Sequence, residues 1–262
     1  MQVFDWDSFI RAEFSQPLAL SIGVFDGVHR GHQKLIEKIR NYAGEHGALG
    51  GLITFIQNPR RILCPEQYPG DIYSLSQKLQ TLEALGAGFV VLIDFSGNIS
   101  KITGGEFVTR IGLERVAYLV LGDGFRCGYR LDTDARAIRD MAAPFGTHTE
   151  LVSQLREGDA PVSSSRIRQA LLAGDLAGAA ALLGRPFRVD LETPEPEKTG
   201  EACFYDLGKE GRVLPPGGRY AARVYTAGSP AGRETVVTLD SGRLFLAPPD
   251  LNVLAVELCS SQ

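Results

Sequence analysis

Cysteine is scarce in this sequence and follows no recognisable spacing. Four cysteines occur in 262 residues, and no two of them form a CxxC pair or a spacing typical of metal ligands. This pattern disfavours a disulfide-stabilised protein, and we expect buried or incidental thiols of a reducing compartment. The four are Cys64, Cys127, Cys203 and Cys259.

Long apolar runs and an excess of positive charge are also lacking. No segment approaches the roughly 20 apolar residues that a membrane span needs, and the amino-terminal stretch MQVFDWDSFIRAEF has no apolar run of the kind found in signal peptides. The net charge of -4 argues against broad electrostatic binding to nucleic acid. With 44% hydrophobic and 22% charged residues, the composition is that of an ordinary globular protein. We expect a cytoplasmic protein that binds neither membranes nor nucleic acid.

Short apolar runs alternate with helical patterns through the first 185 residues. The runs are too short and too continuously apolar for surface strands, and they fit strands buried on both faces. They are Leu18–Ile22, Leu49–Phe55, Phe89–Ile93, Val116–Leu121 and Thr147–Val152. Between them, stripes such as Leu35, Ile36 and Ile39 have helical period. This alternation predicts an α/β fold with a five-stranded parallel sheet covered by helices.

The pattern changes in the last third of the chain. The serine run 163–165 can cap a helix over 166–173, and Asp175 can cap a second short helix. From Ala202 onward, short strands are divided by turns rich in proline and glycine, which predicts a small antiparallel barrel or sandwich. The two expected domains are residues 1–185 and 186–262.

A glycine-rich loop separates the first predicted strand of this domain from a helix. Within SIGVFDGVHRGHQ, Gly23, Gly27 and Gly31 stand four residues apart. Glycine lets the backbone approach a ligand closely, and the start of a helix offers N–H groups to an anion. The spacing differs from the G-x-G-x-x-G motif of dinucleotide dehydrogenases. The loop is also not followed by the GK[ST] of P-loop proteins, so both classes are disfavoured. The loop therefore predicts an anion site of a different kind.

Two histidines accompany these glycines. His29 and His32 lie three residues apart at the predicted helix start, so both can face one bound anion. Imidazole donors there could stabilise the extra charge on a phosphorus in its transition state. The alternative is that one histidine caps the helix or packs, although a pair behind a glycine loop favours function. A zinc site would need a third ligand, and neither His46 nor His148 is suitably placed in the sequence, so we predict no metal site made of protein ligands.

The segment GVFDGVHRGHQ resembles the signature of bacterial FAD synthetases, the bifunctional riboflavin kinase/FMN adenylyltransferases of the HxGH nucleotidyltransferase superfamily. LITFIQNPR, LGDGFRCG, PVSSSRIRQALLAGD and LLGRPFRV follow in the order of that family. The resemblance covers roughly residues 16–188. It implies a Rossmann-like nucleotidyltransferase domain that transfers AMP from ATP to FMN, giving FAD and pyrophosphate, with Mg²⁺ neutralising the phosphates.

Matching the motifs residue by residue implies three sets of site residues, of which the first two overlap. The catalytic set is His29, His32 and Arg168. The ATP-binding set is Gly23, Phe25, Asp26, His29, Gly31, His32, Gly122, Ser164, Ser165 and Arg168. The flavin-binding set is Asn58, Pro59, Arg60, Asp123 and Arg126. Arg168 has separate support from its position, because an arginine in the first turn of a serine-capped helix joins a cation to free N–H donors. The alternative is an exposed arginine on a surface helix.

The chain departs from the family's motifs at several points. Gln57-Asn58-Pro59 stands where the family has PHP in a flavin-binding segment, and Gly124 stands where it has Asp or Asn. After the domain junction, VDLETPEPEKTGEACFYDL lacks the kinase's glycine array and its PTAN sequence. We therefore expect an FMN adenylyltransferase without riboflavin kinase activity. Two alternatives stay open, a nucleotide- or flavin-binding protein without turnover and a transferase for another phosphate-bearing acceptor. The oligomeric state is also left open.

Overall fold

The computed structural model describes the whole chain except residues 96, 193–194, 200–201, 247–251 and 262. Its internal contacts divide the chain into two compact units. The first comprises residues 1–66 and 79–161, and the second comprises residues 67–78 and 162–262. This division differs from the expected domain boundary at residue 185, because the two helices after residue 162 belong to the second unit. Within the described residues, no helix combines the length and apolarity needed to cross a membrane.

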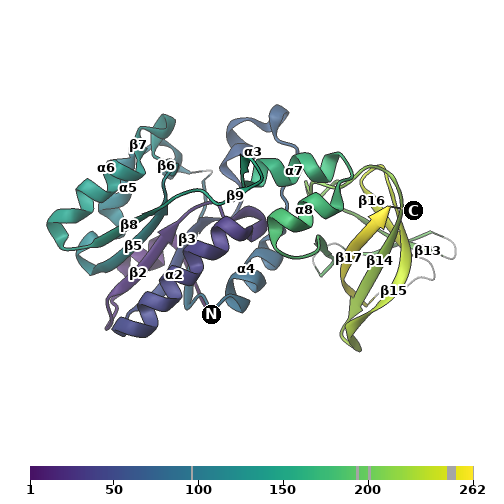
Figure 1. The fold of residues 1–262 in the computed structure, drawn as a ribbon, viewed down its shortest axis with the longest axis horizontal. Coiled ribbons are helices and arrows are strands. Elements are labelled where there is room, and N and C mark those ends of the chain that lie inside the picture. Colours follow the sequence, from purple (N-terminus) through teal and green to yellow (C-terminus); the bar gives the residue numbers. More distant parts are fainter. Residues whose placement is uncertain (96, 193–194, 200–201, 247–251, 262) are drawn as a thin grey trace. The chain divides into compact units, whose positions relative to one another are not determined.

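The first unit is built on a six-stranded sheet in which every neighbouring pair is parallel (Figure 1). The strand order is β1-β4-β3-β2-β5-β8. The strands are β1 Gln2–Asp5, β2 Leu18–Ile22, β3 Leu49–Phe55, β4 Phe89–Ile93, β5 Val116–Gly122 and β8 His148–Val152. Two short hairpins accompany the sheet, β6 Arg126–Cys127 with β7 Thr133–Asp134 and β9 Arg156–Glu157 with β10 Ala160–Pro161. The predicted α/β class is confirmed.

Two details of the predicted sheet were wrong, and both concern its edges. The sheet has six strands rather than five, because Gln2–Asp5 forms the edge strand β1 beside β4. Its side chains are mostly exposed, so no buried run marks it in the sequence. At the other edge, β8 is not buried on both faces as expected, and its first residue His148 is exposed. An edge strand contacts fewer neighbours, so burial gives a weaker signal there.

Helices cover both faces of this sheet. The helices of the first unit are α1 Trp6–Arg11, α2 Arg30–His46, α3 Pro59–Leu63, α5 Gly104–Ile111 and α6 Ala135–Ala142, and α4 Leu75–Ala84 begins in residues of the second unit and ends in residues of the first. α2 packs on β2, β3 and β5 and buries Leu35, Ile36 and Ile39, as its helical stripe predicted. On the opposite face, the main apolar core includes Phe107 of α5 and Ile138 of α6.

The second unit joins two short helices to a seven-stranded antiparallel sheet. Its helices are α7 Ser164–Leu172 and α8 Leu176–Leu183, the latter capped by Asp175 as predicted. The strand order is β11-β17-β14-β15-β16-β13-β12. The strands are β11 Arg188–Asp190, β12 Glu197–Thr199, β13 Ala202–Asp206, β14 Gly218–Thr226, β15 Ser229–Asp240, β16 Arg243–Leu246 and β17 Val253–Ser261. The expected antiparallel β domain is confirmed, and β11 and β12 are two strands that were not predicted.

Candidate functional site

The loop after β2 is a strained turn that follows a fully buried strand. Phe25 has φ 52° and Val28 has φ 40°, in the left-handed region that only glycine enters readily, and Gly27 between them has φ 74°. Both apolar side chains are 0% exposed, and the Thr54 hydroxyl donates a 2.9 Å hydrogen bond to the Val24 carbonyl. Packing therefore holds an unfavourable backbone in place. Strain of this kind is concentrated at ligand-binding turns and active sites.

His29 ends this loop and caps helix α2. Its Nδ1 accepts a 3.3 Å hydrogen bond from the backbone N–H of His32. In the neutral ring, the hydrogen must then lie on Nε2, which makes that nitrogen a donor. The His29 ring is only 7% exposed and stacks on the His32 ring, with centroids 3.6 Å apart. The capping alternative is thus correct for the local structure of His29, and the cap itself orients the second ring nitrogen as a donor.

Gly31 leaves the space that the His29 ring occupies. A methyl group at Gly31 would lie 3.2 Å from Cε1 and Nδ1 of His29, and stacking on His32 limits how far the ring can move. We expect Gly31→Ala to lower kcat of the proposed transfer by about tenfold through this displacement. Alanine favours the helix by up to about 1 kcal/mol, but displacing the His29 cap costs a similar amount, so the free energy of unfolding should change little. Steady-state kinetics and thermal unfolding measure the two effects.

Gly44 offers a matched control on the same helix. A methyl group there meets nothing within 4 Å, so Gly44→Ala should give the gain in stability and leave kcat within about twofold of the wild-type value. Equal kcat values for the two alanine variants would contradict the role given to the His29 ring position.

Three of the predicted segments meet at one edge of the first unit's sheet. β3, β2 and β5 are neighbours, and their carboxyl ends are followed by Asn58, the His29 loop and Asp123, respectively. Parallel strands end at the same edge, and neighbouring strands lie about 5 Å apart. This carboxyl edge is where open α/β sheets bind their ligands. The topology therefore gathers residues that are nearly 100 positions apart in the sequence.

A hollow of about 800 Å³ opens beside the loop after β5. Its lining residues are Asp123, Gly124, Leu151, Ser153, Gln154, Arg136 and Arg139. A Cβ at Gly124 would lie 3.0 Å from Nε2 of Gln154, so the Gln154 amide stands close to the place where a side chain at position 124 would begin. The two arginines were missed in the sequence, although their spacing on one helix was a signal. Arg126 does not line this hollow, and its Nε donates to the Leu131 carbonyl at 3.0 Å.

The predicted flavin segment begins a short helix. The Asn58 side chain is buried, and its Oδ1 accepts a 3.1 Å hydrogen bond from the backbone N–H of Arg60, with Pro59 at the first helical position. Gln57 and Arg60 are exposed. The oxygen of Asn58 thus serves the local fold, whereas Gln57 and Arg60 are presented to solvent.

Comparison with known proteins shows the family to which this chain belongs. The family model for FAD synthetase matches residues 11–166, more than half of the chain. The chain belongs to the FAD synthetase family. Curated relatives are bifunctional riboflavin kinase/FMN adenylyltransferases. The protein of Bacillus subtilis strain 168 is 30% identical over 80% of this chain and 68% of its own length. That of Escherichia coli strain K12 is 27% identical over the same shares, and that of Pseudomonas fluorescens is 33% identical over 64% and 55%.

A solved structure has the same fold as this FAD synthetase family member. It is the crystal structure of a macrolide-efflux protein from Streptococcus pneumoniae, which superposes with a TM-score of 0.80 over 100% of this chain and 91% of that chain. The sequences are 20% identical, so the likeness is one of fold. It extends over both units, the parallel α/β unit and the antiparallel β unit.

The serine motif SSSRIR, residues 163–168, which was predicted to bind phosphate, lies in the second unit. Ser163 caps α7, accepting a hydrogen bond from the backbone N–H of Arg166 at 3.3 Å, so the helix begins at Ser164, two residues earlier than predicted. Arg168 is consequently the fifth residue of α7 and lies beyond the first turn, where it had been expected. Its side chain is 5% exposed, which excludes the alternative of an exposed surface arginine. Ser164 is half-buried and Ser165 is exposed.

Thiol chemistry has little place at this site. All four cysteines are free, and burial raises the pKa of the Cys127 thiol to about 12. A thiol with that pKa stays protonated at neutral pH and is a poor nucleophile.

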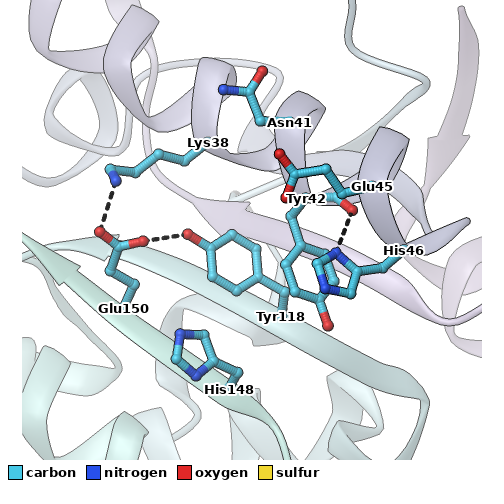
Figure 2. A pocket seen from close by; sticks show the side chains of 8 residues that line it. All are labelled: Lys38, Asn41, Tyr42, Glu45, His46, Tyr118, His148 and Glu150. Atoms are coloured by element: carbon cyan, nitrogen blue, oxygen red, sulfur yellow. Dashed lines mark hydrogen bonds and ion pairs between the residues drawn. The ribbon is translucent and has the colours of Figure 1, made fainter.

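A second hollow, of about 550 Å³, lies between α2 and the amino-terminal halves of β5 and β8 (Figure 2). Glu150 pairs with Lys38 at 2.7 Å and accepts a 2.5 Å hydrogen bond from the Tyr118 hydroxyl. These two hydrogen bonds lower the pKa of Glu150, whereas burial and the bond to Glu150 raise the pKa of Tyr118. Lys38 and Glu150 are thus paired with each other within the hollow.

Aromatic rings continue this second hollow. Tyr42 stacks on Tyr118 with centroids 4.4 Å apart, His46 stacks on Tyr42 at 4.1 Å, and His148 stacks on Tyr118 at 5.6 Å. This row of rings joins the carboxyl-terminal half of α2 to β5 and to the edge strand β8. The row of rings lies near the amino-terminal ends of the strands, away from the His29 loop. We therefore infer that it has a structural role and holds β8 against α2.

Proposed function

We propose that this protein is an FMN adenylyltransferase. The observation that carries the proposal is the strained loop after β2, which ends in two stacked imidazoles at the ligand-binding edge of the sheet in a chain of the FAD synthetase family. An oxygen of the FMN phosphate attacks the α-phosphorus of ATP and forms the new P–O bond. The bond from the α-phosphorus to the oxygen bridging to the β-phosphate breaks in line with it, and pyrophosphate leaves.

The protein residues position the phosphates and neutralise their charge. His29 and His32 donate hydrogen bonds to oxygens on which charge develops. Backbone of the loop and nearby side chains would line the ATP site through Gly23, Phe25, Asp26, Gly31 and Gly122. The sequence motif also gives Ser164, Ser165 and Arg168 a predicted role in binding the β- and γ-phosphates of ATP. The flavin would contact Asn58, Pro59, Arg60, Asp123 and Arg126.

Magnesium fits this proposal as an ion carried by the nucleotide. The described part of the chain contains no group of three His, Cys, Asp or Glu side chains that could hold a metal. Mg²⁺ usually keeps several waters and binds through substrate phosphates with one or two carboxylates. Asp26, a buried carboxylate within the loop itself, is the protein group that suits such a role. The ion would supply positive charge to the triphosphate.

Mass spectrometry of the products tests the activity directly. Incubation with ATP, Mg²⁺ and FMN should yield FAD and an equal amount of pyrophosphate.

Gly124, which has no side chain to bind substrate, favours a second candidate, a binding protein without turnover. That protein would show a higher melting temperature with ATP or FMN and release no pyrophosphate. Pyrophosphate release with a different phosphorylated acceptor, but not with FMN, would instead show a transferase of another specificity.

We also propose that riboflavin kinase activity is absent. The segment Ala255-Val256-Glu257 in β17 resembles the strand that bears the catalytic glutamate in the family's kinase domain. The Glu257 carboxylate accepts a 3.1 Å hydrogen bond from the Tyr225 hydroxyl. Arg188 lies 3.5 Å from the same carboxylate, with its guanidinium 3.8 Å from the centre of the Tyr225 ring. The Glu257 carboxylate is thus held by two neighbouring side chains, and the chain also lacks the kinase's PTAN sequence. Incubation with riboflavin, ATP and Mg²⁺ should therefore form no FMN, and detection of FMN would refute this part of the proposal.

A further inference from the structure

A segment from the first half of the sequence forms part of the second unit. Residues 67–78, here called the strap, lie in sequence between two stretches of the first unit but cluster with the second. The backbone N–H of Asp71 donates to the Gly211 carbonyl at 2.9 Å, and the Val213 N–H donates to the Asp71 carbonyl at 3.0 Å. The strap is thus joined by backbone hydrogen bonds to the loop that precedes β14.

Side chains of the β unit fix the strap at further points. Arg212 is 9% exposed, and its Nη2 donates to the Ile72 carbonyl and to Oε1 of Gln77, both at 3.0 Å. Ser74 donates from its hydroxyl to Oδ2 of Asp190 at 2.7 Å. Several hydrogen bonds from one unit to a short segment restrict the conformations that the segment can adopt. The β unit therefore holds the strap in one conformation.

The strap in turn holds Arg168. Nε of Arg168 donates to the Gly70 carbonyl at 2.7 Å, and Nη2 donates to the Tyr68 hydroxyl at 2.9 Å. The Tyr68 hydroxyl in turn donates a 2.5 Å hydrogen bond to Oδ1 of Asp71. The guanidinium also lies over the Tyr68 ring, 5.0 Å from its centre. Two nitrogens of one guanidinium are thereby bound, which fixes the direction of the third.

We propose that Tyr68 is a positioning residue for Arg168 and that the β unit serves nucleotidyl transfer by anchoring the strap that carries Tyr68. The role rests on the proposed function, in which Arg168 binds the β- and γ-phosphates. An arginine side chain that is already ordered loses less rotamer freedom when it binds a phosphate, and it meets the phosphate in a defined geometry. This role would give the second unit a function in nucleotidyl transfer even if it has no riboflavin kinase activity.

Tyr68→Phe in the full-length protein isolates the hydroxyl, because the ring under the guanidinium stays. We expect kcat/KM for ATP to fall by about tenfold, since a small misplacement of a phosphate-binding group is enough for such a loss. Tyr220→Phe is the matched control. It removes a hydroxyl of the same unit that donates to the Pro216 carbonyl at 2.6 Å and does not touch the strap. Its kcat/KM should stay within about twofold of the wild-type value.

A double-mutant cycle separates positioning from a general structural role. If Tyr68 acts through Arg168, Tyr68→Phe should have no further effect in an Arg168→Ala or, should that variant not fold, an Arg168→Lys background. The cycle is measured twice, on kcat/KM and on ATP affinity by calorimetry. Wild-type protein that forms no FAD but shows the coupling in ATP affinity would refute the proposed function and leave the role of Tyr68 intact. Additive effects, or a Tyr68→Phe protein with wild-type kcat/KM and ATP affinity, would overturn that role.

Discussion

Replacing His29 by asparagine is expected to lower kcat for FAD formation by a factor of about 10²–10³, the usual loss when one preorganised donor to a developing charge is removed. The substitution is chosen because His29 has two roles. Its Nδ1 caps helix α2, and its other ring nitrogen is the proposed donor. Asparagine is among the best N-caps and has no imidazole. The melting temperature should therefore stay close to that of the wild-type protein while the rate of FAD formation, followed by chromatography, falls.

The second histidine gives the same test without the complication of the cap. His32→Ala should also lower kcat by about 10²–10³. His46→Ala is the control, because His46 ends the same helix and lies in the second hollow, stacked on Tyr42. Its kcat should stay within about twofold of the wild-type value. Wild-type rates in both loop variants would show that the two imidazoles take no part in the chemistry and that His29 serves only as a helix cap.

Arg168→Ala is expected to affect both activity and stability. The proposed loss of a cation at the β- and γ-phosphates should lower kcat/KM for ATP by about 10² or more. The same change leaves the Gly70 carbonyl and the Tyr68 hydroxyl without their buried donor. Unsatisfied buried groups cost about 1–3 kcal/mol, so the free energy of unfolding should fall by about that amount. Denaturant titration and kinetics at saturating FMN measure the two effects.

Two further variants make the Arg168 result specific. Arg168→Lys keeps the positive charge but cannot make both hydrogen bonds with the same geometry, so its kcat/KM should lie between those of the wild-type and alanine proteins. Arg223→Ala removes an arginine of the same unit that forms an exposed 3.1 Å pair with Glu234. Exposed pairs contribute little, and both activity and stability should remain nearly unchanged. A lower stability with an unchanged kcat/KM in Arg168→Ala would show that this arginine is structural only.

Much of the fold was visible in the sequence because burial imposes a simple pattern. Leu18–Ile22, Leu49–Phe55 and Phe89–Ile93 have in the structure the bounds that their apolar runs predicted. Interior strands of a parallel sheet are covered on both faces, so their sequences are continuously apolar. Edge strands have no such constraint. Gln2–Asp5 was therefore missed, and the burial of β8 was overestimated.

The site shows the same division at the level of single residues. The glycine loop and the two histidines could be recognised from the residue types and their spacing alone. The left-handed backbone of Phe25 and Val28 could not, because only packing against the rest of the unit makes such conformations tolerable. Likewise, the buried state of Arg168 depends on Tyr68 and Gly70, about 100 residues earlier in the chain.

By itself, the sequence determined the family, the α/β unit followed by an antiparallel β unit, and the chemical types of the candidate site residues, because periodicity and local motifs depend on neighbours along the chain. Only the tertiary structure decided that residues 67–78 join the second unit, that Arg168 is held by the strap, and that His29 both caps a helix and stacks on His32. Hydrogen bonds and packing between distant segments leave no periodic trace in a sequence. They arise when folding brings those segments together.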